Sequence, residues 1–283
     1  MASDALRARF SDVRTLHEGD RFLVFAARRL AGERDLPADV SIKVPVDGGG
    51  AWLGDVLDHS AAVLAAVGPH PNIVALYERL ELPDRRVAIV EQYCARSLAD
   101  DLNSGAKMPL RAVAATGIKL AGALDALHAA GFVHCDVRPA NVLVDASGEP
   151  LLSGFEEAVA RDGDAAAALH ITSPHTAPEL LEGTAAGPAT DVYGLASTLY
   201  ELIAGRAAFR AYAGESPASV IVRVLSGQVK PIVAADIPLD MSDLLTWAMS
   251  GDPAKRPPSP AWLAEELRRI ERRQGWPRTE LLA

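Results

Sequence analysis

The stretch His134–Asn141 reads HCDVRPAN and runs directly into the apolar stretch Val142–Val144. Within it, the carboxylate of Asp136 and the amide of Asn141 stand five residues apart. An Asp–Asn spacing of five has little weight by itself. Here a histidine, a basic residue and a proline flank the pair, and a short β-branched run typical of a buried strand follows it. The combination is specific enough to guide the interpretation of the whole chain.

This stretch resembles the catalytic loop of eukaryotic-like protein kinases, in which HRDxKPxN is followed by a strand. In that family the aspartate receives the proton of the substrate hydroxyl, and the asparagine holds Mg²⁺. The resemblance therefore implies that Asp136 and Asn141 are catalytic residues, with Asn141 also the metal ligand. In style the motifs are most similar to those of bacterial Ser/Thr kinases.

Five further segments match motifs of the same family and occur in the family's order. They are Val40–Lys43 (VSIK), His70–Val74 (HPNIV), Ala177–Glu179 (APE), Asp191–Leu195 (DVYGL) and Asp252–Pro257 (DPAKRP). The resemblance implies that Lys43 grips the nucleotide phosphates and that Arg256 pairs with Glu179. It also argues against a small-molecule phosphotransferase of related fold, because the APE segment and the late arginine build the lobe that binds peptide substrates in protein kinases.

Periodicity predicts a β-rich front and a helical back. Short β-branched runs predict strands over 21–29, 39–44, 73–82 and 86–92, with a helix over 52–67. Further helices are predicted over 109–130, 191–204 and 260–273. With the resemblance, we expect an α+β, bilobal protein-kinase-like domain over 1–275 and a short tail over 276–283. Its N-lobe, about 10–92, is a small antiparallel sheet with one helix, and its C-lobe, about 93–275, is larger and mainly helical.

The metal-binding part of the family pattern is altered. Thirteen residues after Asn141, where the family has the aspartate of DFG, the sequence reads Gly154-Phe155-Glu156. Glycine has no side chain to bridge Mg²⁺ to phosphate, so we expect a defective metal site and phosphotransfer slowed by roughly 10³. Glu156 or Glu157 is the alternative source of a metal-binding carboxylate.

The glycine-rich loop is altered as well. The segment His17–Val24 (HEGDRFLV) lies where the family has GxGxxGxV and keeps only Gly19 and Val24. Glycines at these positions let backbone N–H groups approach phosphate closely. We expect Phe22 to push the loop away or to fold into the pocket.

Two charged partners of the family are also missing. The helix over 52–67 offers only Asp55 and Asp58 where the family has the glutamate that pairs with the lysine, so Lys43 is left unpaired if neither reaches it. Cys135 stands where the family has the arginine that receives a phosphorylated activation loop. Switching by phosphorylation, for which the candidates are Thr172, Ser173 and Thr176, is therefore not expected.

Composition excludes other classes of protein. With 49% hydrophobic and 23% charged residues the chain is globular, and its 28 Lys+Arg against 37 Asp+Glu, net charge −9, disfavour a nucleic-acid partner. No apolar run reaches the ~18 residues of a membrane span, and no signal-peptide pattern opens the chain. Cys94 and Cys135 lie too far apart for a metal or redox motif. We therefore expect a cytoplasmic protein with reduced thiols.

These features predict a pseudokinase in bacterial signalling, with impaired or absent phosphotransfer, that acts as a binding or allosteric module for a protein partner. One alternative is an active atypical Ser/Thr protein kinase that transfers the γ-phosphate of ATP to protein hydroxyls. Another is a scaffold that binds no nucleotide. ATP is the expected ligand of the cleft in the first two cases, and Mg²⁺ is expected to bind poorly. The residues implied for catalysis are Lys43, Asp136 and Asn141, and those implied for nucleotide binding are Gly19, Val24, Lys43, Glu91 and Tyr93, with Val90 limiting pocket depth.

Overall fold

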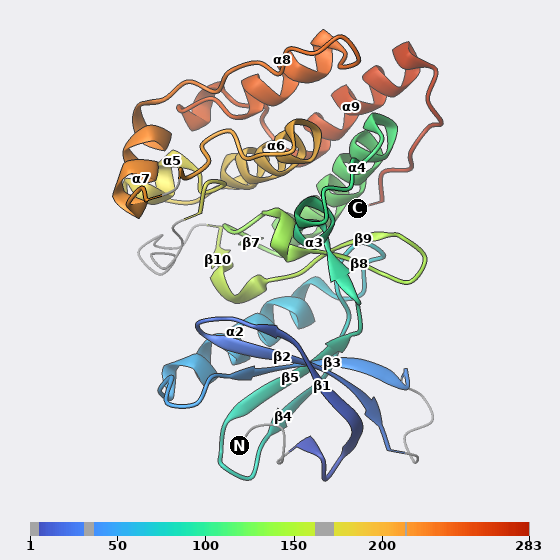
Figure 1. Ribbon diagram of the computed structural model, residues 1–283, viewed down its shortest axis with the longest axis vertical. Coiled ribbons are helices and arrows are strands. Elements are labelled where there is room, and N and C mark those ends of the chain that lie inside the picture. The colour runs from blue at the N-terminus through green and yellow to red at the C-terminus, as the bar shows by residue number, and fades with distance from the viewer. Residues whose placement is uncertain (1–5, 31–36, 162–172, 213, 283) are drawn as a thin grey trace.

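The computed structural model describes residues 6–30, 37–161, 173–212 and 214–282 and has two lobes (Figure 1). The N-lobe is a five-stranded antiparallel sheet in the order β1-β2-β3-β5-β4, with helix α2 packed across it. Its elements are β1 (Phe10–Glu18), β2 (Phe22–Arg29), β3 (Asp39–Pro45), α2 (Trp52–Val67), β4 (Leu76–Glu81) and β5 (Val87–Gln92).

Alternation along β3 explains how the N-lobe sheet is oriented. Val40, Ile42 and Val44 are fully buried in a core that they share with side chains of β1, β2 and β4. Because successive residues of a strand face opposite sides, Lys43 faces the other way, and it pairs in register with Val24 on β2. The sheet thereby presents Lys43 away from this core.

The C-lobe is mainly helical, as expected, with short strands on the side that faces the N-lobe (Figure 1). Its helices are α3 (Leu98–Asn103), α4 (Leu110–Ala129), α5 (Pro178–Leu181), α6 (Pro188–Ala204), α7 (Pro217–Ser226), α8 (Leu239–Ala248) and α9 (Pro260–Gln274). The short elements are β6 (Arg96–Ser97), β7 (Phe132–Val133), η1 (Pro139–Asn141), β8 (Val142–Val144), β9 (Pro150–Leu152), η2 (Phe155–Glu157), β10 (Val159–Ala160) and η4 (Pro253–Lys255).

A buried ion pair joins two distant parts of the C-lobe. Arg256 donates to Glu179 through both Nη atoms, each at 2.7 Å from a carboxylate oxygen, and the guanidinium lies 4.9 Å from the ring centre of Tyr193. Their side chains are 0% and 5% exposed. The predicted pair of Arg256 with Glu179 is confirmed, and it holds α5 against the segment between α8 and α9.

The chain beyond α9 packs back onto the C-lobe (Figure 1). The buried carboxylate of Glu271 on α9 accepts hydrogen bonds from the backbone N–H and the hydroxyl of Thr279, at 3.1 and 2.6 Å. Farther on, the carbonyl oxygen of Leu282 lies 3.2 Å from Nε2 of His70 and so close to Gly122 that an added Cβ there would be 1.8 Å away. A glycine at 122, in the middle of α4, therefore leaves room for this segment.

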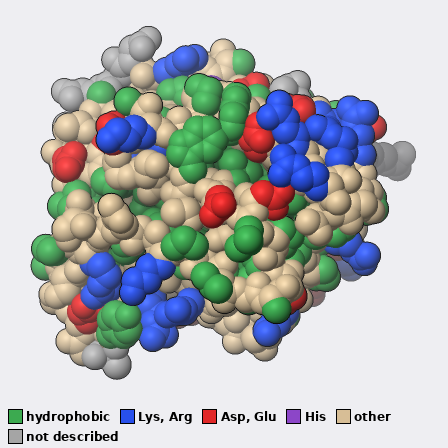
Figure 2. Space-filling view, turned by 90° about the horizontal axis from the view of Figure 1, so that it is seen from above, with side chains coloured by type: hydrophobic (Ala, Val, Ile, Leu, Met, Phe, Trp, Pro, Cys, Tyr) green, Lys and Arg blue, Asp and Glu red, His purple; other side chains and the backbone are tan. Residues whose placement is uncertain are grey.

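The expected fold class is confirmed, and most predicted boundaries lie within two residues of the structure. The strand predicted over 73–82 is shorter, because Ile73 bridges to Leu152 instead of continuing β4. Within the described residues, no helix is long and apolar enough to cross a membrane. At the C-lobe end of the molecule, Lys and Arg side chains lie in separate groups with hydrophobic and acidic side chains between them (Figure 2).

Candidate functional site

The loop that carries Asp136 is fixed by hydrogen bonds to buried groups. Asp191 in the first turn of α6 accepts from the backbone N–H groups of His134 and Cys135 at 2.8 and 2.9 Å, and its carboxylate lies 2.7 Å from Nε2 of His128. Nε2 of His134 lies 3.0 Å from a backbone carbonyl oxygen. Both histidines thus form hydrogen bonds in the core.

Asp136 and Asn141 lie in contact. The amide Nδ2 of Asn141 donates to Oδ2 of Asp136 at 2.7 Å, and Nε of Arg138 donates to the same oxygen at 3.0 Å. Burial raises the pKa of the Asp136 carboxyl, against the opposing pull of Arg138 and His134. The carboxylate at the centre of the loop is therefore occupied by two donors of its own chain.

At Gly154, the side chain of Asn141 occupies the space that a larger residue would need. Gly154 has φ +82°, and a Cβ built there would lie 2.5 Å from Cγ of Asn141 and 2.7 Å from both Nδ2 and Oδ1. A carboxylate at this position would require both a left-handed backbone, which L-residues adopt at a cost, and a displaced amide. Both the backbone conformation and the packing of Asn141 thus favour glycine at position 154.

Replacing Gly154 with alanine is expected to destabilise the fold more than the same change at Gly148. Both glycines have positive φ, but no atom lies within 4 Å of the Cβ position of Gly148. Gly148→Ala therefore measures the cost of the left-handed backbone alone. We expect Gly154→Ala to lower the free energy of unfolding by about 1–3 kcal/mol more, the usual range for overpacking. Urea unfolding of the two variants measures the difference, and equal losses would show that Asn141 moves aside freely.

Lys43 pairs with Glu156. The ammonium forms a short ion pair with Oε1 of Glu156, and the two side chains are 15% and 9% exposed. Burial alone would lower the pKa of Lys43, but the carboxylates of Glu156 and Glu91 outweigh it and raise this pKa. Burial likewise works to raise the pKa of Glu156, and Lys43 outweighs it, so this pKa is lowered. Both groups are therefore charged at neutral pH.

The expected acidic partners on α2 lie elsewhere. Asp58 forms a two-point ion pair with Arg79 of β4, with Nη2 to Oδ2 at 2.9 Å, and Asp55 is exposed to solvent. The prediction that Lys43 is unpaired if neither aspartate reaches it is wrong, because a glutamate from the C-lobe takes their place.

The turn between β1 and β2 also reaches the C-lobe. Arg21 in this turn forms an ion pair with Glu157 at 2.5 Å, and the side chain of Glu157 is only 4% exposed. Gly19 donates its N–H to the carbonyl of Phe22 at 3.0 Å. The phenyl ring of Phe22 packs on the small cluster of Leu57 and Ala61 of α2 and Ile89 of β5.

The segment between the lobes contains the remaining predicted nucleotide-binding positions. Glu91 and Val90 at the end of β5 are buried, and burial raises the pKa of Glu91 although Lys43 opposes this shift. The hydroxyl of Tyr93 accepts from Nη2 of Arg14 on β1 at 2.8 Å. The structure thus brings Lys43 and Glu91 close together, with Val24 opposite Lys43, while Tyr93 contacts the neighbouring edge of the sheet.

Cys135 has an unusual backbone, with φ +66°, and burial raises the pKa of its thiol. A neutral, buried thiol offers no cation to a phosphate group. Of the three candidate phosphorylation positions, Thr172 lies outside the described residues, while Thr176 is buried and its hydroxyl accepts from the N–H of Ser173 at 3.1 Å.

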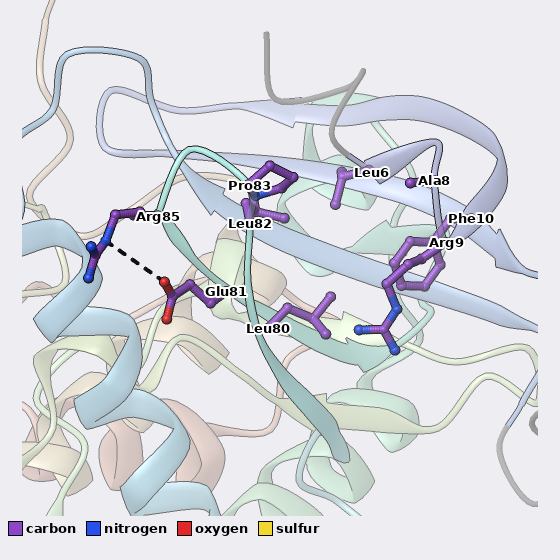
Figure 3. A pocket seen from close by; sticks show the side chains of 9 residues that line it. All are labelled: Leu6, Ala8, Arg9, Phe10, Leu80, Glu81, Leu82, Pro83 and Arg85. Carbon is purple, nitrogen blue, oxygen red and sulfur yellow. Dashed lines mark ion pairs between the residues drawn. The ribbon is translucent and has the colours of Figure 1, made fainter.

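A cavity of about 410 Å³ lies elsewhere in the N-lobe, where the start of β1 meets the turn between β4 and β5 (Figure 3). Its floor consists of buried apolar side chains, and the guanidinium groups of Arg9 and Arg85 form ion pairs with Glu78 and Glu81. None of the predicted site residues lines it; the lining residues are Leu6, Ala8, Arg9, Phe10, Leu80, Glu81, Leu82, Pro83 and Arg85.

Comparison with known proteins places this geometry in a family. The model of the protein kinase domain matches residues 57–267, and the chain belongs to this family. The matched range begins inside α2, so Gly19, Val24 and Lys43 precede it.

Individual relatives point the same way. The chain is 37% identical over 209 residues to the serine/threonine-protein kinase PknK of Mycobacterium tuberculosis (strain ATCC 25618 / H37Rv), covering 73% of this chain and 19% of the relative. It is 29% identical over 265 residues to mitogen-activated protein kinase kinase kinase 20 of Arabidopsis thaliana, covering 89% and 75%. It is 30% identical over 198 residues to the serine/threonine-protein kinase PkaB of Streptomyces coelicolor, covering 66% and 46%. The chain thus spans about a fifth of the length of PknK.

Two residues of the site, which pair with each other, are only weakly indicated by the sequence. The motifs suggest Glu157 only as a metal ligand, and they suggest Arg21 only as one residue of an altered loop. The signal that could have found them is complementary charge: an arginine where the family has a glycine-rich turn, and two glutamates directly after the phenylalanine of the altered DFG triplet.

Proposed function

We propose that this protein kinase domain is a pseudokinase, whose phosphotransfer is impaired or absent and which acts as a binding or allosteric module for a protein partner. The observation that carries the proposal is the packing of Asn141 against Gly154. The family's metal site needs a carboxylate at the position of Gly154 and a free amide oxygen nearby. Position 154 has no side chain, and the amide of Asn141 occupies the space that a side chain there would need.

The pairing of Lys43 supports the same proposal. A nucleotide phosphate must compete for this ammonium with Glu156, whose carboxylate is already largely shielded from water. Displacing it leaves a buried carboxylate without a cation, which is unfavourable. The cleft residues therefore do not fit the family's metal–triphosphate group, and their arrangement supports no transfer step through Mg²⁺. Cys94 and Cys135 are both buried free thiols, which suits the cytoplasmic setting expected from the sequence.

The second candidate function is that of an active, atypical Ser/Thr protein kinase. It is favoured by the catalytic loop, in which Asp136 and Asn141 keep their mutual contact and the support of Asp191. In this case Glu156 would leave Lys43 and supply the missing carboxylate to a metal ion. A protein substrate is implied by this second candidate function, and a protein partner by the first.

A phosphotransfer assay separates the two. The protein is incubated with ATP, either Mg²⁺ or Mn²⁺, and several protein acceptors, and phosphate incorporation is read by mass spectrometry. We expect no incorporation above that of Asp136→Ala, and a cellular function that survives this substitution. Incorporation that disappears in Asp136→Ala, in a variant that is still folded by circular dichroism, would establish the active kinase.

A further inference from the structure

Two neighbouring glutamates of the C-lobe hold two cations of the N-lobe. Glu156 pairs with Lys43 of β3, and Glu157 pairs with Arg21 in the turn between β1 and β2. The side chains of the glutamates are 9% and 4% exposed, so water screens these pairs much less than it screens a surface pair. The strand and the turn that border the phosphate side of the cleft in the family fold are therefore joined to the C-lobe through shielded charges.

The same segment also touches α2 and is anchored in the C-lobe. The carbonyl oxygen of Ala158 lies 2.6 Å from Nε2 of His59 on α2. Phe155, which precedes the glutamates, is fully buried, and its ring packs edge-on against His134 with 4.9 Å between ring centres. Residues 156–158 thus link the core of the C-lobe to three elements of the N-lobe: β3, the turn between β1 and β2, and α2.

Other groups that the family resemblance assigns to a nucleotide also have partners within the chain. Besides Lys43, whose ammonium is paired, the backbone N–H of Gly19 donates to the carbonyl oxygen of Phe22 at 3.0 Å. The hydroxyl of Tyr93, just after β5, accepts from Nη2 of Arg14 on β1 at 2.8 Å. Each of these contacts has to break before the same group can bind a ligand.

The charges around the two cations disfavour an added anion. Close to Lys43 and Arg21 lie three carboxyl groups that are largely shielded from water, those of Glu91, Glu156 and Glu157. To take both cations, a triphosphate has to leave two shielded carboxylates without them. An ion pair of this kind is costly to break because the charge left behind has no water and no partner.

We infer that residues 156–158 take the place of a nucleotide in this domain: they hold the two lobes in one closed arrangement that ATP neither produces nor alters. Protein kinase domains in general bind ATP between their lobes. Here the carboxylates of Glu156 and Glu157 are the partners of the two cations instead of phosphate groups. The inference rests on the proposed function, since it says that such a module meets its protein partner in a single state, without control by nucleotide.

Thermal unfolding of the wild-type protein tests whether nucleotide binds. The unfolding midpoint is measured with millimolar ATP or ADP, each in Mg²⁺, Mn²⁺ or EDTA, and compared with the same buffer without nucleotide. A ligand at a hundred times its dissociation constant raises the midpoint of a domain of this size by about 5 °C. We expect a rise of less than about 1 °C in every condition, and a larger rise with either nucleotide overturns the inference.

Spin labels measure the spacing of the lobes. They are attached through Arg85→Cys in the N-lobe and Val233→Cys in the C-lobe, two positions with exposed side chains. The native thiols of Cys94 and Cys135 are buried, so the labels react at the introduced sites. With no other substitution we expect a single distance distribution that ATP leaves unchanged. Two populations without nucleotide, or a distribution that ATP shifts, overturn the inference.

Charge-removing variants test whether residues 156–158 hold the lobes. Glu156→Gln with Glu157→Gln keeps the size of both side chains, and with the same labels we expect a wider distribution that extends to longer distances. Glu157→Gln alone, which keeps the pair of Lys43, serves if the double variant does not fold. The matched control is Asp58→Asn, because Asp58 pairs with Arg79 within the N-lobe and is 39% exposed. It should leave the distribution unchanged, and a folded glutamine variant that does the same contradicts the inference.

Failure of this inference is distinguishable from failure of the proposed function. If a nucleotide raises the unfolding midpoint and no phosphate is incorporated into protein acceptors, residues 156–158 do not replace the nucleotide, while the pseudokinase proposal stands. If phosphate is incorporated and the incorporation disappears in Asp136→Ala, both the inference and the pseudokinase proposal fail.

Discussion

Replacing Lys43 with alanine lowers the free energy of unfolding by about 3–5 kcal/mol, the cost typical of removing one partner of a buried ion pair. The reason is the pair of carboxylates left behind. Glu156 is 9% exposed and loses its cation, while Glu91 is buried beside it, and burial already raises the pKa of the Glu91 carboxyl. Neither can regain water unless residues 156–158 move away from the N-lobe.

Urea unfolding followed by circular dichroism measures this loss. The matched control is Lys119→Ala, because the partner of Lys119, Glu149, is 43% exposed and well solvated. That variant should change stability by no more than about 1 kcal/mol. The double variant Lys43→Met with Glu156→Leu, which replaces the pair by apolar groups, should recover the part of the loss that comes from Glu156. A loss below about 1 kcal/mol in Lys43→Ala would mean that Glu156 is solvated once unpaired.

This expectation affects how the variant is used. In an active kinase the same substitution serves as a loss-of-activity control for a protein that otherwise stays intact. Here a lost phenotype in Lys43→Ala would report unfolding as much as lost nucleotide binding. Asp136→Ala is the better choice, because Asp136 contacts Arg138 and Asn141 without closing the lobes together.

The second large effect is expected for Arg256→Ala, again about 3–5 kcal/mol. Arg256 donates twice to the buried Glu179 and also to the carbonyl oxygens of Ser250, Ala189 and Gly251. Its removal leaves the carboxylate of Glu179, which is 5% exposed, without its cation, and three carbonyl oxygens without this donor. These groups join α5 to the segment between α8 and α9. In this variant we therefore expect unfolding to begin in the C-lobe.

The control for this prediction is Arg269→Ala on α9. Arg269 pairs with Glu266 one turn away, but its side chain is 55% exposed, so its removal should change the free energy of unfolding by at most about 0.5 kcal/mol. Guanidinium unfolding curves for both variants give the comparison. Similar midpoints for the two would show that the pair of Arg256 and Glu179 is dispensable for folding.

The C-lobe is more predictable from the sequence than the cleft. The partnership of Glu179 with Arg256 can be anticipated because both residues sit in motifs with a fixed place in the family fold. The helices over 110–129 and 260–274 follow from an apolar period that packing then preserves. In each case a local pattern in the sequence determines the outcome.

The strand β1 shows where local pattern is insufficient. The sequence predicts no strand over 10–18, and the pairing of β1 with β2 is interrupted by two shifts of register, one of them spanning Asp12, which has φ +54°. Each shift breaks the alternation of inward and outward side chains, which is the signal that strand prediction relies on.

The charges of the cleft are unpredictable for a different reason. Lys43 and Glu156 are 113 residues apart, on different lobes, and their pairing depends on how the two lobes are placed relative to each other. Sequence identifies the charged residues but not which side chains meet across the cleft. The alternative of Asp58 as partner is reasonable by spacing and fails because Arg79 lies on the neighbouring strand.

The packing of the segment after α9 against α4 has a consequence for folding during synthesis on the ribosome. The space at Gly122 is filled by the carbonyl of Leu282, which emerges 160 residues later. At about 5–20 residues per second, roughly 8–30 s pass before that carbonyl is made. For most of this interval α4 also lacks α9 (Pro260–Gln274), the helix that packs against it in the folded C-lobe. This part of the C-lobe can therefore close only after residue 282 has been synthesised, and until then the surface of α4 at Gly122 lacks the segment that covers it.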